Sequence, residues 1–263
     1  MARDDAGAGP SQSSLLPKVA RILDHLSTAG DANATELAAA VDEPRSSMYR
    51  LLRSLADIGW VEETGARGVW RLGGELFRLS AAAINRIDER QVARPHLERL
   101  HQATEQTVYL CIRNDMRAVC IDRLEGVKVA SQALKLGGSL PLHQGAAPLV
   151  LLAFGESDLW EQWRRTAASE QLELRTELTL ATVDDVMRDL AKVRDQGYAI
   201  SDGDVTPGIA AIGVPVFNRN SLLVASVSVS GMRESILDAE GRVLELVLAA
   251  GRAISRSLGY REP

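Results

Sequence analysis

Apolar residues in the first part of the chain recur at helical spacing in three short segments separated by breaks. The segments that this spacing predicts to be helices are residues 17–27, 35–41 and 44–58. Asn33 or Thr35 can cap the second helix, and Gly59 ends the third. The apolar stripe of the third helix consists of Met48, Leu51, Leu52, Leu55 and Ile58.

Two short strand-like segments, residues 60–63 and 69–72, follow the helices and enclose a glycine-containing turn over residues 64–68. Three helices and a small hairpin predict a winged helix-turn-helix over residues 15–73. A further helix is expected over residues 74–90, and its apolar stripe could pack on its own domain or on a second copy of the chain. The residues of that stripe are Leu76, Leu79, Ala83, Ile84 and Ile87.

Beyond residue 91 the pattern changes to alternating strands with helices inserted between them. Strands are predicted over residues 107–112, 118–124, 128–134, 198–201, 210–217 and 222–230. Helices are predicted over residues 91–104, 145–154, 158–168, 182–196 and 234–258. Strands joined by short turns favour an antiparallel sheet, so the expected fold class is α+β. The expected organisation is a disordered tail (1–14), a DNA-binding domain (15–73), a linker helix (74–90) and an effector-binding and oligomerisation domain (91–263).

The composition restricts the function without deciding it. A net charge of -5 argues against a nucleic-acid binder that depends on bulk positive charge. Cys111 and Cys120 lack metal-ligand spacing and are expected to be buried thiols of a reducing compartment. No run of about 18 apolar residues predicts a membrane span, and residues 1–14 lack the features of a signal peptide. We therefore expect a cytoplasmic protein.

The third helix offers hydrogen-bond donors on the face opposite its apolar stripe, as a helix that reads DNA must. Arginine can pair with a guanine edge, and a helix N-terminus attracts phosphate. The alternative is a helical bundle with a solvated basic face. Residues 1–73 carry eight basic and ten acidic side chains, so two linked copies are needed for firm DNA binding. The candidate DNA-binding residues are Arg45, Ser46, Ser47, Tyr49, Arg50, Arg53 and, at the hairpin tip, Arg67.

Two other classes of function compete with a DNA-binding regulator. An enzyme would need a nucleophile–base pair or a metal set, but the chain contains no Gly-x-Ser-x-Gly and no Cys-x-x-Cys. We expect no catalytic residue, no metal and no cofactor. A sensor that acts through a protein partner without DNA remains the other alternative.

The sequence also resembles the IclR family of bacterial regulators over almost its whole length after the tail. The likeness near the N-terminus lies in Pro44-Arg45-Ser46-Ser47, Arg50-Leu51-Leu52 and Gly59-Trp60-Val61-Glu62. It continues in Leu140-Pro141-Leu142-His143, Gly145-Ala146-Ala147, Gly197-Tyr198-Ala199-Ile200-Ser201-Asp202, Pro207-Gly208-Ile209-Ala210 and Ser226-Val227-Ser228-Val229-Ser230-Gly231. One departure is Pro148-Leu149-Val150, where the family commonly has Gly-Lys-Ala.

The resemblance implies a winged-helix head, a linker helix and a GAF-like domain that binds a small molecule. It also implies homodimers or tetramers that repress or activate catabolic genes from a DNA operator, which we expect to be pseudo-palindromic. The effector-binding residues that it implies are Leu140, Gly145, Ala146, Asp202, Ile209, Ala211, Ser228 and Ser230.

The chemistry of these residues suits a ligand with one polar end. Backbone N–H groups at the start of a helix at residue 145 favour a carboxylate. Ser228 and Ser230 are two residues apart, so their hydroxyls share one face of a strand. His143 and Asp202 could add polar contacts, and the apolar neighbours favour an aromatic or other small organic acid. Alternatively, the small residues only allow close helix–sheet packing and the serines face solvent.

Overall fold

The computed structural model describes residues 15–84, 88–127, 134–156, 158–169, 172–238 and 240–261. The chain divides into two compact units, Met1–Asn85 and Arg86–Pro263, which we describe separately. The predicted tail over residues 1–14 lies outside the described residues. The strand predicted over residues 128–134 also lies outside them, except for Leu134.

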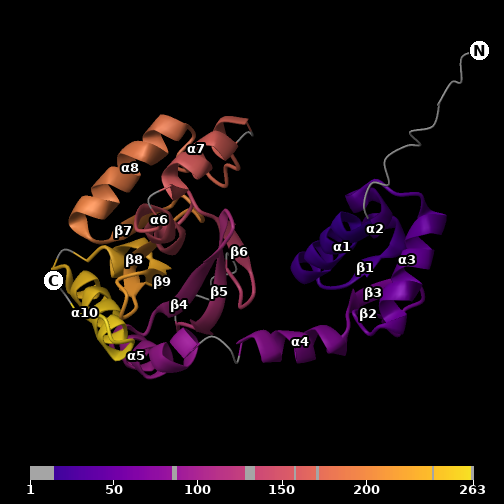
Figure 1. Cartoon of the computed structure of the whole chain (residues 1–263), viewed down its shortest axis with the longest axis horizontal. Coiled ribbons are helices and arrows are strands. Elements are labelled where there is room, and N and C mark those ends of the chain that lie inside the picture. The colour runs from indigo at the N-terminus through magenta and orange to yellow at the C-terminus, as the bar shows by residue number, and fades with distance from the viewer. Residues whose placement is uncertain are drawn as a thin grey trace, which may run out of the picture. The chain divides into compact units, whose positions relative to one another are not determined.

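The first unit is a winged helix-turn-helix, as the sequence predicts (Figure 1). Its helices are α1 (Leu15–Ala29), α2 (Ala34–Val41) and α3 (Arg45–Asp57). Its antiparallel sheet has the order β1-β3-β2, formed by β1 (Ala32–Asn33), β3 (Val69–Leu72) and β2 (Val61–Glu63). Strand β1 is not predicted, because a two-residue strand is too short to show alternation.

Local chemistry explains where the helices of this unit begin and end. The Asn33 side chain accepts hydrogen bonds from the Thr35 and Glu36 amides, and the Glu36 carboxylate accepts one from the Asn33 amide. This capping box fixes the start of α2. The predicted stripe of α3 is correct for Met48, Leu52 and Leu55. It is wrong for Ile58, which is 52% exposed because the helix ends one residue earlier.

The first unit ends in α4 (Gly74–Ile84), and the second begins with α5 (Asp88–Thr104). The helix predicted over residues 74–90 therefore corresponds to α4 and the first residues of α5, and residues 85–87 are not described. On α4 the side chain of Phe77, which the predicted stripe omits, is 79% exposed.

The second unit is built on a six-stranded antiparallel sheet with the order β6-β5-β4-β9-β8-β7. The strands are β4 (Thr107–Asn114), β5 (Arg117–Leu124), β6 (Ser139–Pro141), β7 (Ala199–Asp202), β8 (Ile209–Phe217) and β9 (Leu223–Met232). All except β6 match a predicted strand. The fold class α+β is confirmed.

Helices cover both faces of this sheet (Figure 1). On one face lie α6 (Ala146–Ala153), α7 (Leu159–Ser169) and α8 (Val183–Gln196), and on the other lie α5 and α10 (Arg242–Ser257). Strand alternation separates the two cores. On β4, Tyr109 and Cys111 pack towards α6, while Val108 and Leu110 pack towards α5 and α10.

Two glycines shape this unit. A Cβ atom on Gly213 of β8 would lie 2.8 Å from the carbonyl carbon of Ala146, so glycine lets α6 approach the sheet. Gly241, with φ of +67°, caps α10. The helix predicted over residues 234–258 is correct for α10 but wrong at its start, because Arg233–Ile236 form a separate short helix, α9.

The structure confirms the predicted ends of α8 and the buried thiols of this unit. Thr182 caps α8 by accepting from the Asp185 amide, and Gly197 ends that helix with a left-handed conformation. Cys111 and Cys120 are free, buried thiols. Among the helices of the described part of the chain, none is both long and apolar enough to cross a membrane.

Candidate DNA-binding face and ligand pocket

The outer face of α3 presents the polar side chains that the sequence singled out. Met48, Leu52 and Leu55 anchor the opposite face in the core of the first unit. Ser47 is half-buried, and its hydroxyl lies 3.4 Å from the Arg50 guanidinium. The predicted DNA-binding residues that are exposed on this helix are Arg45, Ser46, Tyr49, Arg50 and Arg53.

The N-terminus of α3 is open to an external acceptor. The residue before the helix is Pro44, which provides no side-chain cap. The amides of the first helical turn have no partner within the helix, so an external anion can accept from them. Arg45 lies in that first turn and adds a positive charge.

The β2–β3 hairpin holds Arg67 at its exposed tip. Its turn is fixed from both sides, because the Thr64 hydroxyl accepts from the Ala66 amide and the Glu63 carboxylate accepts from the Gly68 amide. The tip also lies close to α3, since a Cβ atom on Gly68 would be 3.3 Å from the Tyr49 hydroxyl.

The arginines of this face differ in their pairing. The Arg71 guanidinium forms an ion pair of 2.6 Å with Glu62 across the hairpin. In contrast, within the described residues no carboxylate pairs with Arg45, Arg50, Arg53 or Arg67. Of the five arginines between residues 44 and 71, four thus keep their charge available to a ligand.

In the second unit, a cavity of about 50 Å³ lies between the sheet and the N-terminus of α6. Seven of the nine predicted effector residues line it, from three segments that are distant in sequence. They are Leu140, Gly145, Ala146, Ile209, Ala211, Ser228 and Ser230. The serines face the cavity, and not solvent, because Ser226, Ser228 and Ser230 share the α6 side of β9 and the Ser226 hydroxyl donates to the Ala147 carbonyl.

The other two predicted residues, His143 and Asp202, lie outside the cavity lining. Asp202 forms an ion pair of 2.8 Å with Arg233, because alternation along β7 turns Ser201, and not Asp202, towards the cavity. His143 packs beside Trp163, with ring centroids 6.0 Å apart, and its Nε2 lies 3.2 Å from the Glu173 carbonyl oxygen. Burial lowers the pKa of His143, and the Glu173 carbonyl partly offsets this effect.

Sequence reasoning missed about half of the lining. The missed residues are Tyr109, Leu134, Ala147, Pro148, Ser201, Val205, Thr206 and Ala210. Strict alternation from Ala199 along β7 identifies Ser201, so this residue had a usable signal. Val205 and Thr206 lie in the loop between β7 and β8, where no periodicity predicts which way a side chain points.

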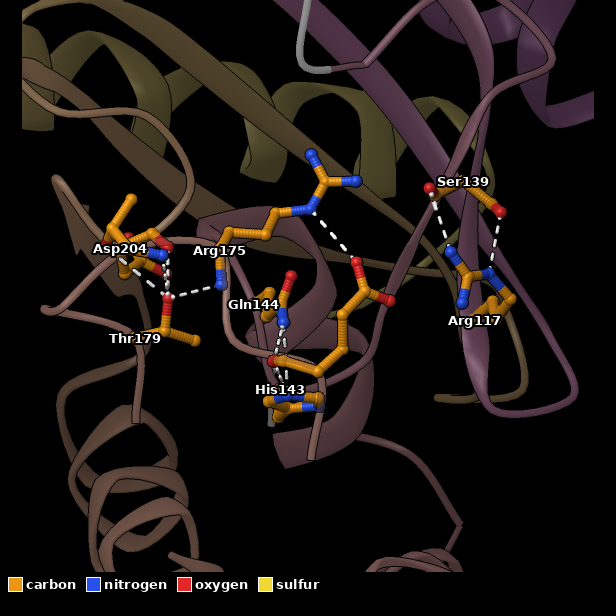
Figure 2. Close-up of polar contacts among 9 residues, drawn as sticks. Arg117, Ser139, His143, Gln144, Arg175, Thr179 and Asp204 are labelled. Atoms are coloured by element: carbon orange, nitrogen blue, oxygen red, sulfur yellow. Dashed lines mark hydrogen bonds and ion pairs between the residues drawn. The ribbon is translucent and has the colours of Figure 1, made fainter. Parts of the chain in front are cut away.

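The start of α6 is already capped by a carboxylate from that loop. The Gly145 amide donates to Asp204 Oδ2 at 2.9 Å, and the Ser201 hydroxyl donates to Asp204 Oδ1. Figure 2 shows Asp204 beside Thr179, whose hydroxyl donates to the Asp204 carbonyl oxygen at 2.6 Å. The next two helix residues, Ala146 and Ala147, have amides without an acceptor among the described residues.

The cavity lining is neutral. It contains no lysine, arginine or histidine among the described residues. Its polar groups are the helix amides and the hydroxyls of Tyr109, Ser201, Thr206, Ser228 and Ser230. Such a lining can bind one polar group among apolar contacts. In the described part of the chain, no group of three or more His, Cys, Asp or Glu side chains could hold a metal ion.

A winged helix-turn-helix with a basic, exposed third helix, joined to a sheet unit with a small pocket, defines a ligand-responsive DNA-binding regulator. Comparison with known families agrees. Residues 16–65 match the IclR helix-turn-helix domain, and residues 81–256 match the C-terminal domain of bacterial IclR transcriptional regulators. The chain belongs to the IclR family of DNA-binding transcriptional regulators, and the resemblance seen in the sequence is confirmed.

Individual relatives support the same conclusion. The chain is 32% identical to the transcriptional regulator XynR of Escherichia coli, over 88% of this chain and 91% of XynR. It is 30% identical to the E. coli repressor AllR, over 88% and 85%. Among solved structures, IclR of Thermotoga maritima has a TM-score of 0.68 at 27% identity, covering 93% of this chain and 98% of that one. These relatives are transcriptional regulators, not enzymes.

Proposed function

We propose that this regulator controls catabolic genes by binding a pseudo-palindromic operator as a homodimer or tetramer, and that a small organic acid in the sheet-unit pocket changes that binding. The observation that carries the DNA part is the outer face of α3, where exposed arginines without acidic partners surround an uncapped helix N-terminus.

Each group on this face has a definite task on DNA. The α3 amides and the Ser46 hydroxyl suit phosphate oxygens, Arg50 suits a guanine edge in the major groove, and Arg67 suits the adjacent minor groove or backbone. A single head is close to neutral overall, so its phosphate contacts give weak binding. Two heads on two half-sites bring both sets of arginines to one operator. The exposed Phe77 on α4 is consistent with such pairing.

The pocket limits the size of the effector. A cavity of about 50 Å³ holds only a few water molecules, at roughly 10–15 Å³ each. A short-chain acid therefore fits it more readily than an aromatic one. An aromatic acid requires the cavity to widen, and its most adaptable wall is the β7–β8 loop that carries Val205 and Thr206. The carboxylate would accept from the amides of Ala146 and Ala147.

One related structure makes an aromatic acid a useful probe. An IclR homolog of Microbacterium hydrocarbonoxydans, with a TM-score of 0.77 and 24% identity over 94% of this chain and 99% of that one, was crystallised with 4-hydroxybenzoate. That likeness shows a shared fold. We propose 4-hydroxybenzoate as the first aromatic compound to test.

The DNA function is tested by electrophoretic mobility shift on the upstream region of the regulator's own gene. Arg50→Ala should weaken binding while size-exclusion chromatography shows unchanged assembly. Arg71→Ala is the matched control, because Arg71 is paired with Glu62 and should matter less. No shift with wild-type protein, with or without metabolite extract, would instead favour a sensor that acts through a protein partner.

The effector is tested by isothermal titration calorimetry with short-chain acids such as isobutyrate and aromatic acids such as 4-hydroxybenzoate. Binding should disappear in Ala211→Trp, which fills the cavity. Binding that persists in this variant would place the ligand elsewhere.

A further inference from the structure

Asp204 lies where a negative charge is least expected in an acid-binding pocket. Its carboxylate accepts from the Gly145 amide, and from the hydroxyl of Ser201, which lines the cavity. The following residues, Val205 and Thr206, also line the cavity. The protein thus places its own anion at the helix end to which a ligand carboxylate would bind.

We propose that Asp204 is an internal competitor of an acidic effector and sets the charge preference of the pocket. This inference rests on the acid-binding function proposed above. An acid bound to the Ala146 and Ala147 amides would lie next to the Asp204 carboxylate. Because the lining provides no cationic side chain to balance two anions, they repel each other across a poorly solvated gap. Binding of the acid therefore drives Asp204 away from Gly145.

The contacts of Asp204 connect this displacement to a second segment. The Thr179 hydroxyl donates to the Asp204 carbonyl, and the Thr176 hydroxyl donates to the Gly203 carbonyl at 2.8 Å. Earlier in the same segment, the Glu173 carbonyl accepts from the side chain of Gln144. Gln144, labelled in Figure 2, precedes α6. Residues 172–180 are therefore tied both to the β7–β8 loop and to the segment that leads into α6.

These contacts predict that residues 172–180 move when an acid binds and stay in place when a neutral ligand binds. Loss of the Asp204–Gly145 bond frees one end of the β7–β8 loop, and the hydroxyls of Thr176 and Thr179 transmit the movement to residues 172–180. A neutral isostere of the same shape makes similar apolar contacts but does not repel Asp204. Ligand charge, and not ligand shape, then decides whether the loop moves.

The experiment compares acid and amide pairs of equal shape in full-length protein. Isobutyrate with isobutyramide, and benzoate with benzamide, are titrated calorimetrically into wild type and Asp204→Asn. The variant should bind the acids at least about tenfold more tightly, and the amides with less than about twofold change. Asp202→Asn is the matched control, since it removes a charge two residues away that pairs with Arg233 outside the lining; it should leave both affinities unchanged.

Two further measurements separate charge from loosening of the loop. Thr179→Val removes the hydroxyl that donates to the Asp204 backbone carbonyl. It keeps the charge of Asp204 and lies outside the cavity lining, so the affinities for acids should stay close to those of wild type. Hydrogen exchange at the Gly145 amide, which loses its bond to Asp204, and over residues 172–180 should accelerate in wild type when acid binds, and stay unchanged with the amide.

The outcomes distinguish the two proposals. Equal acid affinities in wild type and Asp204→Asn would overturn the competitor role while leaving the acid-binding function intact. Tighter binding of acid and amide alike, or the same gain in Thr179→Val, would also overturn it, because the effect would then be loop release and not charge. If no acid binds even to Asp204→Asn, the acid-binding function fails and the competitor role fails with it.

Discussion

The N-termini of α3 and α6 are the same structural feature in opposite settings. The first turn of α3 is exposed, has no side-chain cap and is flanked by Arg45 and Arg50. The first turn of α6 is buried, lies among neutral residues and is already capped by the Asp204 carboxylate. Both helices present partial positive charge from their amides.

The difference shows that a helix end becomes an anion site through its neighbours. Around α3, unpaired arginines add to the field of the amides, so an external phosphate is attracted. Around α6, Asp204 cancels that field until it is displaced. The regulator thus has one helix end that is ready for its ligand and one that its own side chain protects. Variants that disturb each helix end separately test this contrast.

Truncating a buried side chain of α3 should have the largest effect on stability and on operator binding. Leu52 is fully buried in the core of the first unit, and Leu52→Ala should destabilise that unit by about 2–5 kcal/mol. Differential scanning calorimetry should show the loss in one transition, with operator binding reduced or abolished. Unchanged titration of an acid probe is the control, since the pocket belongs to the other unit. Equal loss in both units would show that they do not unfold independently.

Adding a methyl group between α6 and the sheet should have the next largest effect, on the stability of the second unit and on its affinity for acids. Gly213→Ala places a Cβ atom 2.8 Å from the carbonyl carbon of Ala146, and overpacking of this kind costs about 1–3 kcal/mol. The helix must move, so the melting temperature of the second unit and its affinity for acids should both fall. Gly74→Ala is the matched control, because a Cβ atom there meets nothing within 4 Å. A wild-type melting temperature in Gly213→Ala would mean that α6 can move away from the sheet without loss of stability.

These variants rely on features that the sequence revealed to different degrees. The stripe of α3, the cap of α8 at Thr182 and its end at Gly197 follow from local chemistry, and the structure confirms them. The paired serines of β9 were predicted to face one way, because strand alternation leaves no other choice. Helical and strand periodicity therefore predicted most of the fold, whereas the residues that line the pocket were implied by the resemblance to the family.

Tertiary contacts decided the rest. Asp202 belongs to a segment that carries the resemblance to the family, yet its side chain points away from the cavity and pairs with Arg233. The polar contacts next to the cavity are instead made by Ser201 and Asp204. Nothing local predicts that the Asp204 loop folds back on Gly145, which is 59 residues earlier in the chain. Similarly, the pairing of Arg71 with Glu62 separates it from the other arginines only once the hairpin register is known.

A change at the hairpin tip should have a smaller effect that is specific to DNA. Arg67 is exposed and has no acidic partner among the described residues, so Arg67→Ala should weaken operator binding by about 1 kcal/mol and lower the salt slope of log K by about one for each head. Fluorescence anisotropy at several salt concentrations measures both quantities. Arg71→Ala again serves as the control. An unchanged slope would mean that Arg67 touches no phosphate.

The smallest expected effect is the pH dependence of stability that His143, near the start of α6, contributes. Burial lowers the pKa of His143, so in the native state this side chain binds a proton less readily than in the unfolded chain. Its contribution to stability is complete above the unfolded pKa of about 6.5 and declines as the pH falls below that value. The melting temperature of the second unit should therefore be lower at pH 5.5 than at pH 7.5, by less than about 4 °C.

His143→Gln isolates this contribution, because glutamine can still donate a hydrogen bond to the Glu173 carbonyl but does not titrate. His96 contributes with the same sign, since burial and then Arg99 lower its pKa, so the variant should reduce the pH dependence without abolishing it. Asp189, whose pKa burial raises, contributes with the opposite sign at lower pH. Identical pH dependence in wild type and His143→Gln would show that protonation next to α6 does not affect stability.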